Sequence, residues 1–199
     1  MTQFINVPET VQFYYEKRAN TEAIDLLLNQ KNPPKDSRWE ELNEFYSARL
    51  AAEKTQYDLW NFFREMAAKL WGAPLANFSH CRESDMADYE GGQRLETVWD
   101  EKEFYQSFRI RDRYFFCIGC QICQESSLNM WFYLLDENDE DLSIQWNLSE
   151  NWAADDEDYI VAKDVLPVSG CKSIDLAPCY NLLGEVFKTL HLSVERTSA

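Results

Sequence analysis

Three cysteines, Cys117, Cys120 and Cys123, follow one another at intervals of three in the segment "FCIGCQICQ". Cysteine thiolates at such intervals are typical ligands of zinc and of iron–sulfur clusters. A ferredoxin-type loop adds a fourth nearby cysteine, usually followed by proline, whereas this chain continues with "QES" and its next cysteine is Cys171. The spacing alone therefore does not establish a metal site.

The residues around these cysteines alternate in the way that a β-strand requires. Successive side chains of a strand point to opposite faces of the sheet, so Cys120 is expected to face away from Cys117 and Cys123. Thiolates placed in this way cannot bind one metal ion. The sequence therefore favours buried strand thiols, since free cysteine behaves as a small apolar residue. The alternative is a structural zinc site, or an enzymatic site, in the Cys117, Cys120 and Cys123 region.

A second candidate for chemistry is the segment His80–Glu90, which holds a histidine, a cysteine and several carboxylates. Neighbouring residues such as His80 and Cys81 rarely face each other. The chain has neither a glycine-rich phosphate loop nor a nucleophile elbow, and the segment "DENDED" lacks the glycine of a calcium loop. The sequence therefore predicts no catalytic residue, no cofactor and no metal ligand. An enzyme that uses the His80–Glu90 segment stays open as an alternative.

Acidic residues dominate the charge of the chain. It holds 35 Asp and Glu against 19 Lys and Arg, for a net charge of −16. The stretch from Tyr114 to Ala162 holds eleven acidic residues and no Lys or Arg, although ordinary surfaces mix both signs. Such a balance repels nucleic-acid phosphates and anionic membranes. We therefore expect no direct binding to nucleic acid or membrane, and a basic protein as the partner.

The acidic residues of two segments, "DENDED" and "ENWAADDED", form the predicted partner-binding surface. A strand expected at residues 142–148 joins them and would span about 23 Å at 3.3 Å per residue. In a simple meander the two segments would then lie at opposite ends of the sheet, over a distance comparable to the width of a nucleic-acid duplex. The members of this surface are Asp136, Glu137, Asp139, Glu140, Asp141, Glu150, Asp155, Asp156, Glu157 and Asp158.

These features predict a non-enzymatic interaction protein that binds a basic, nucleic-acid-handling partner and inhibits it. Immunity proteins, and anti-defence proteins of phages and mobile elements, are acidic single-domain proteins of this kind. Two alternatives stay open: acidic turns that only keep the protein in solution, and an acidic adaptor or structural subunit. The N-terminal segment "MTQFINVPETVQ" lacks the features of a secretory signal, so we expect a cytoplasmic protein with reduced cysteines.

The length of 199 residues suits a single domain, 1–199, in which three parts differ in pattern. Residues 1–74 predict helices, because a capping box at Ser37 and Glu40 opens a long helix over about 37–71. We expect the apolar side of this helix to face the core. That side consists of Leu42, Tyr46, Leu50, Tyr57, Trp60, Phe63, Ala67 and Leu70.

Residues 75–170 predict mainly strands. A short strand is expected at 94–99 and a short helix from Asp100, followed by strands at 114–123, 129–136, 142–148 and 159–168. Residues 171–199 predict a helix that begins near Pro178. The expected fold class is α+β: a helical N-terminal half packed on an antiparallel β-meander of about four to five strands, closed by a C-terminal helix.

Overall fold

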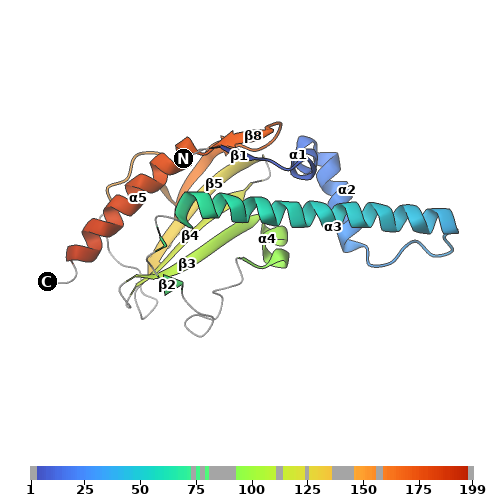
Figure 1. Cartoon of the computed structure of the whole chain (residues 1–199), viewed down its shortest axis with the longest axis horizontal. Coiled ribbons are helices and arrows are strands. Elements are labelled where there is room, and N and C mark those ends of the chain that lie inside the picture. The colour runs from blue at the N-terminus through green and yellow to red at the C-terminus, as the bar shows by residue number, and fades with distance from the viewer. Residues whose placement is uncertain are drawn as a thin grey trace.

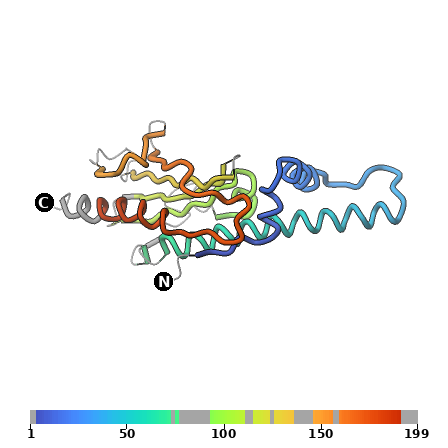
Figure 2. Tube along the Cα trace, turned by 90° about the horizontal axis from the view of Figure 1, so that it is seen from above, coloured from blue at the N-terminus to red at the C-terminus, as the bar shows by residue number. Residues whose placement is uncertain are grey.

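The computed structural model describes residues 4–72, 75–76, 79–80, 93–110, 114–123, 126–135, 146–155 and 159–196. An antiparallel sheet carries helices on one face, and a helical arm projects beyond the sheet (Figures 1 and 2). This arrangement of helices and strands is α+β and confirms the predicted fold class.

The main sheet is antiparallel at each strand pair that the structure describes. In spatial order its strands are β2 (Ser79–His80), β3 (Glu103–Ile110), β4 (Tyr114–Ile122), β5 (Ser127–Leu135), β7 (Tyr159–Pro167) and β6 (Ala153–Asp155). A second, small sheet pairs β1 (Phe4–Asn6) with β8 (Ser173–Asp175). The strands β4, β5 and β7 correspond to predicted strands of the meander, whereas β3 precedes them and was not predicted as a strand.

The helices fall into two groups: some form an arm that projects beyond the sheet, and the others cover the core (Figure 1). They are α1 (Glu9–Glu16), α2 (Arg18–Asn29), α3 (Trp39–Ala67), α4 (Leu95–Glu101) and α5 (Ala177–Arg196), with a π-helical turn, η1 (Ala68–Gly72), after α3. The C-terminal half of α3 packs against β3 and α5 packs against β7. The N-terminal half of α3 projects away from the sheet beside α2 (Figure 1). No helix in the described part of the chain is long and apolar enough to cross a membrane.

Strand alternation divides the side chains of the sheet between two faces. Phe116 and Cys120 of β4 belong to the main core, together with residues of α3 and α5. Cys117 belongs to a separate cluster with Trp131 and Val161. The prediction that Cys117 and Cys120 point to opposite faces of one strand is therefore confirmed.

The start of α3 differs from the prediction by one residue. Glu41, rather than Glu40, accepts a hydrogen bond from the backbone N–H of the N-cap residue Arg38, at 2.8 Å. The Ser37 hydroxyl donates to the Pro34 carbonyl at 2.6 Å and takes no part in the helix. The predicted hydrogen bond between a glutamate side chain and the N-cap backbone is therefore present, but it is displaced by one position. It stabilises the first turn of α3 after the helix break at Pro33–Pro34.

The two elements before the meander were predicted with the wrong type. Residues 95–101 form the helix α4 rather than a strand, because Val98 and Trp99 bury one side of it. Residues 103–110 form β3 rather than a helix. The apolar–polar alternation of β3 is interrupted by the polar residue Gln106. Its side chain accepts a hydrogen bond from the Trp71 indole at 2.7 Å and so takes part in a partly buried contact.

The predicted apolar side of α3 is largely solvent-exposed in the arm. Phe63, Ala67 and Leu70 are buried as expected, but Tyr46 and Leu50 are 56% and 68% exposed. The core-facing side instead carries Ala52, Thr55, Leu59, Phe62 and Met66. The prediction followed the largest apolar residues, whereas the packed side of the arm uses smaller ones.

Candidate functional site

Two members of the predicted acidic surface lie within the described residues, Glu150 and Asp155, and both are exposed. Glu150 lies in the turn before β6, next to Ser149, whose backbone N–H donates to the Glu185 carboxylate of α5 at 2.9 Å. Asp155 is the last residue of β6. Outside the described residues lie Asp136, Glu137, Asp139, Glu140, Asp141, Asp156, Glu157 and Asp158.

The first acidic segment and the Asp155 end of the second are attached to the same end of the sheet, whereas Glu150 precedes β6. The strand register pairs Phe132 of β5 with Ile160 of β7, and Asp155 of β6 with Tyr159 of β7. Leu135, which precedes the first segment, therefore ends its strand where β6 ends and β7 begins. The expected placement of the two segments at opposite ends of the sheet was wrong.

The strand expected at 142–148 is the source of that error. Residues 142–145 lie outside the described part, and Trp146 and Leu148 belong to no strand. Trp146 and Trp152 pack edge-on against Phe132, with ring centroids 4.7 and 5.1 Å away. Because Phe132 belongs to the main core, the segment 146–152 lies against the core face before β6 joins the sheet edge. It does not form the middle strand of a meander.

An aromatic cluster lies on the outer face of the sheet and reaches its acidic end. Trp131 and Tyr133 of β5 are stacked, with centroids 6.0 Å apart and planes within 3°. Tyr159 of β7 contacts both rings edge-on, at 5.4 and 5.2 Å. Tyr105 of β3 packs on Trp131 at 5.6 Å. We call these four residues the aromatic ladder.

Trp131 is the centre of the ladder and is only 7% exposed. Its indole N–H donates to the Glu103 carboxylate of β3. Gly119 of β4 is its register partner, and a Cβ atom at Gly119 would lie 2.4 Å from the indole ring. The missing side chain at Gly119 therefore allows the indole to lie across β4 and to bring the other three rings together.

Charged groups surround the ladder. Burial raises the pKa of Glu103 to about 7, although the hydrogen bond from Trp131 acts in the opposite direction. Asp155 forms an ion pair with Lys163 of β7 at 3.2 Å, and both side chains are about half exposed. Lys163 is the first basic residue after the acid-only stretch, so the fold places one cation among these carboxylates.

This arrangement suits the binding of cationic side chains. Tyr159 is 42% exposed, and aromatic rings attract Arg and Lys through their negative faces. Carboxylates next to such rings can accept charge-assisted hydrogen bonds from the same cations. The sequence places Asp156, Glu157 and Asp158 immediately before Tyr159.

The candidates for metal chemistry are not brought together in the described part of the chain. Cys117 and Cys120 are fully buried on opposite faces, and burial raises the pKa of Cys120 well above its usual value. The Cys123 thiol lies 2.8 Å from the Ser127 hydroxyl. His80 is in β2, while residues 81–90 are outside the described ranges. Among the described residues, no group of three or more His, Cys, Asp and Glu could hold a metal ion.

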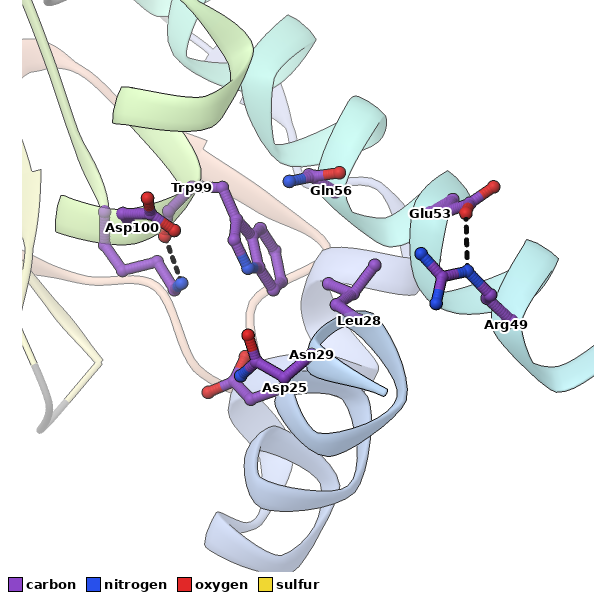
Figure 3. Close-up of a pocket in the computed structure, with 9 residues that line it drawn as sticks. Asp25, Leu28, Asn29, Arg49, Glu53, Gln56, Trp99 and Asp100 are labelled. Atoms are coloured by element: carbon purple, nitrogen blue, oxygen red, sulfur yellow. Dashed lines mark hydrogen bonds and ion pairs between the residues drawn. The ribbon is translucent and has the colours of Figure 1, made fainter. Parts of the chain in front are cut away.

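A cavity of about 500 Å³ between α2, α3 and α4 was not predicted (Figure 3). Charges of both signs line it, including Arg49 and Glu53, which form an ion pair at 3.0 Å. The lining residues are Asp25, Leu28, Asn29, Arg49, Glu53, Gln56, Trp99, Asp100 and Lys102. The cavity is therefore lined by acidic and basic side chains together, and the charges of Arg49 and Glu53 neutralise each other.

Lys102 lines the cavity, and its pKa is shifted from the usual value for lysine. Burial lowers its pKa to about 8, although Asp25 and Asp100 act in the opposite direction. Its ammonium group donates to the Trp99 carbonyl and lies 3.8 Å from the centroid of a Trp99 ring. Cations that bond the last carbonyls of a helix stabilise its C-terminal end. These contacts give Lys102 a structural role at the end of α4.

The sequence analysis missed the aromatic ladder, although a signal for it was present. Tyr105, Trp131, Tyr133 and Tyr159 occupy three neighbouring strands, and the alternation within "WFY" places Trp131 and Tyr133 on one face. Which strands are neighbours, however, depends on β5 pairing directly with β7. Comparison with known proteins found no matching family model, no matching curated protein and no matching solved structure.

Proposed function

We propose that this protein is a non-enzymatic, acidic interaction protein that binds a basic partner at the acidic end of its sheet. The observation that carries the proposal is the position of the aromatic ladder. Tyr133 and Tyr159 lie side by side at the end of the sheet where β5 and β6 end and β7 begins. Leu135, which precedes the first acidic segment, and Asp155 of the second segment lie at that end, whereas Glu150 precedes β6.

Carboxylates and rings contribute differently to such an interface. Clustered charge speeds the encounter with a partner of opposite sign and selects against other partners. Tyrosine and tryptophan commonly supply most of the binding energy once water is excluded. A net charge of −16 together with an exposed ring at Tyr159 therefore favours a partner that presents Arg and Lys side chains.

The partner class follows from the same chemistry. Proteins that bind nucleic acids carry clustered Lys and Arg, which neutralise phosphates. An acidic surface that occupies such a cluster blocks the nucleic acid. We therefore propose an inhibitor of a nucleic-acid-handling protein, as immunity or anti-defence proteins are, acting in the cytoplasm by occupying the phosphate-binding surface.

A defined cationic probe tests the proposed surface. Binding of a fluorescent nona-arginine peptide is measured by anisotropy over a range of salt concentrations. The wild-type protein should bind less tightly as salt rises, because exposed charges are screened. Changing Asp155, Asp156, Glu157 and Asp158 to Asn or Gln should weaken binding at low salt about tenfold or more. Adding Tyr159→Ala to these four changes should weaken peptide binding further, without altering how that binding depends on salt.

A matched variant separates this surface from net charge. Glu22, Glu44, Glu65 and Glu96 are exposed on helices away from the ladder, and their change to Gln removes the same four charges. This control should bind the peptide nearly as well as the wild-type protein does. Equal losses in the two variants would show that the peptide responds only to overall charge, and the proposed surface would be rejected.

A further inference from the structure

The helix α3 is apolar on two opposite sides. One side faces the core and includes the buried residues Leu59, Phe62 and Met66. The other side carries large exposed residues: Trp39 (79%), Tyr46 (56%), Leu50 (68%) and Tyr57 (53%). At about 100° per residue, these four lie within about 40° of one another and opposite the core side. We call them the α3 stripe.

A helix that is apolar on both sides is normally covered on both sides. In this protein one side of α3 packs on the sheet and on α2. The stripe begins at the first residue of α3, on the half that projects beyond the sheet (Figures 1 and 2), and reaches Tyr57 in the C-terminal half. Large side chains of these types each offer about 150–250 Å², so the exposed fractions leave roughly 500 Å² of apolar surface. The largest apolar patch of a monomer is commonly about 300–600 Å² and is often functional; here Glu53 and Lys54 lie between Leu50 and Tyr57.

The spacing of the stripe reads the same in both directions. Its members are separated by seven, four and seven residues, and the midpoint lies at Ala48. A second copy of α3, laid antiparallel about that midpoint, places Trp39 against Tyr57 and Tyr46 against Leu50. Two-fold dimers require such a self-complementary surface, and seven- and four-residue steps follow the seam along which helices pack at small angles.

The net charge of the chain favours the antiparallel orientation over the parallel one. In antiparallel register, Lys54 and Asp58 of one copy, which form an ion pair within α3, each come within two residues, about 3 Å along the axis, of Glu40 on the same flank of the other copy. The attraction of Glu40 to Lys54 is therefore offset by its repulsion from Asp58. Parallel two-fold pairing would place equivalent flanking residues on opposite sides of the seam. It would also bring together the two sheets, whose chains each carry a net charge of −16.

We propose that two copies of this protein pair through their α3 stripes as an antiparallel, two-fold symmetric dimer. The two stripes together bury roughly 1,000 Å², which is the lower limit for a specific interface, so the dimer is weak and forms at high protein concentration. Each sheet, with its acidic end, then lies at a distal end of the dimer. This proposal is independent of the function proposed above, because it uses a different surface.

Sedimentation equilibrium of the full chain over a wide range of protein concentration tests the pairing. We expect a monomer–dimer equilibrium that strengthens as salt rises, because salt screens the repulsion between two acidic chains and leaves apolar contact intact. Binding to a basic probe shows the opposite salt dependence, so the failure of one proposal is distinguishable from the failure of the other. A monomer at every concentration and salt would overturn the proposal.

Two stripe variants and one control locate the interface. Leu50→Glu and the milder Leu50→Gln should shift the equilibrium toward monomer, the first more than the second. Leu26→Glu adds the same charge at a 65% exposed position of α2 and should leave the dimer intact. Leu50 and Leu26 are both exposed, so circular dichroism and thermal unfolding of the three variants should match those of the wild-type protein. A dimer that survives Leu50→Glu would overturn the assignment to the stripe.

A zero-length carbodiimide cross-link reports the orientation. Within one copy, Lys54 and Glu40 are separated by 14 residues of helix, about 21 Å, so an amide between them can form only across two copies. We expect mass spectrometry to find this cross-link in the dimer and to lose it in Leu50→Glu. A dimer in which the Lys54–Glu40 cross-link is missing would exclude the antiparallel register.

Discussion

Gly119 of β4 lies beneath the indole ring of Trp131, its register partner on β5. A methyl group at Gly119 would lie 2.4 Å from the ring, closer than any real contact. The ring therefore spans β4 only because this position has no side chain. Tyr105, Tyr133 and Tyr159 all contact Trp131, so this one backbone position determines the geometry of the whole aromatic ladder.

Gly119→Ala should displace the Trp131 ring and destabilise the protein by about 1–3 kcal/mol, as overpacked positions do. Urea unfolding monitored by tryptophan fluorescence measures the change. Gly184→Ala is the matched control: it lies within α5 with no atom within 4 Å of the added carbon. That change should stabilise the helix by about 0.5–1 kcal/mol. Similar effects at both positions would contradict the close approach of Trp131 to β4.

Glu103 should make stability depend on pH. Its pKa is raised from 4.5 to about 7. Between these two pH values, the carboxyl group of Glu103 is therefore protonated in the folded state and ionised in the unfolded state. The stabilisation from Glu103 is therefore fully present below pH 4.5 and is lost as pH rises through 7. Glu103→Gln keeps an oxygen acceptor for the Trp131 indole but does not titrate. Relative to the wild-type protein, it should gain roughly 1–3 kcal/mol between pH 4.5 and 8.

Chemical unfolding of both proteins at several pH values measures this difference directly. The gain must develop between the two pKa values of Glu103. A difference that stays constant across this range would mean that the carboxyl group titrates normally, and that Trp131 is not held by a buried carboxyl group.

The two sides of α3 should respond very differently to truncation. Phe63 is fully buried, so Phe63→Ala should cost about 3–5 kcal/mol. Tyr57 is 53% exposed, and Tyr57→Ser should change stability by less than about 0.5 kcal/mol. Both changes are measured by thermal or urea unfolding at a protein concentration where the chain is monomeric. A severe loss from Tyr57→Ser would indicate that the stripe belongs to the core.

The buried cysteines should act independently of each other. Cys117 and Cys120 lie in different apolar clusters on opposite faces of β4, so each change to Ala should cost about 1–2 kcal/mol through lost packing. Costs at sites without shared partners add in the double variant. Purified protein should contain no stoichiometric zinc or iron. A bound metal ion that both changes release, with strongly non-additive costs, would restore the zinc site as the correct interpretation.

The sequence was sufficient for those parts of the fold that local patterns determine. The alternation around Cys117 and Cys120 predicted β4 and its two faces, and the pattern after Pro178 predicted α5. The pattern failed where a tertiary contact decides the outcome. Gln106 faces a partner indole rather than solvent, which hid β3, and α4 is helical because Val98 and Trp99 pack inward.

The candidate site depended on strand order, which no local pattern supplies. The acidic segments were identified from their composition, but their position required the pairing of β5 with β7. The same pairing creates the ladder from Trp131, Tyr133 and Tyr159. Three residues of the α3 stripe, Tyr46, Leu50 and Tyr57, were assigned to the core, because the helical period of apolar residues does not tell which side of a helix meets the sheet.

The most direct test of the proposed function is a comparison of what the wild-type protein and its two charge variants retain. Each immobilised protein is exposed to an extract of its source cells at low and at high salt, and the bound proteins are quantified by mass spectrometry. We predict a protein with clustered Lys and Arg that the wild-type chain and the Glu22, Glu44, Glu65 and Glu96 control retain at low salt. The Asp155–Asp158 variant should lose it, and high salt should release it. Equal retention by all three proteins, or a partner whose binding does not respond to salt, would contradict the proposal that the acidic end of the sheet is the binding surface.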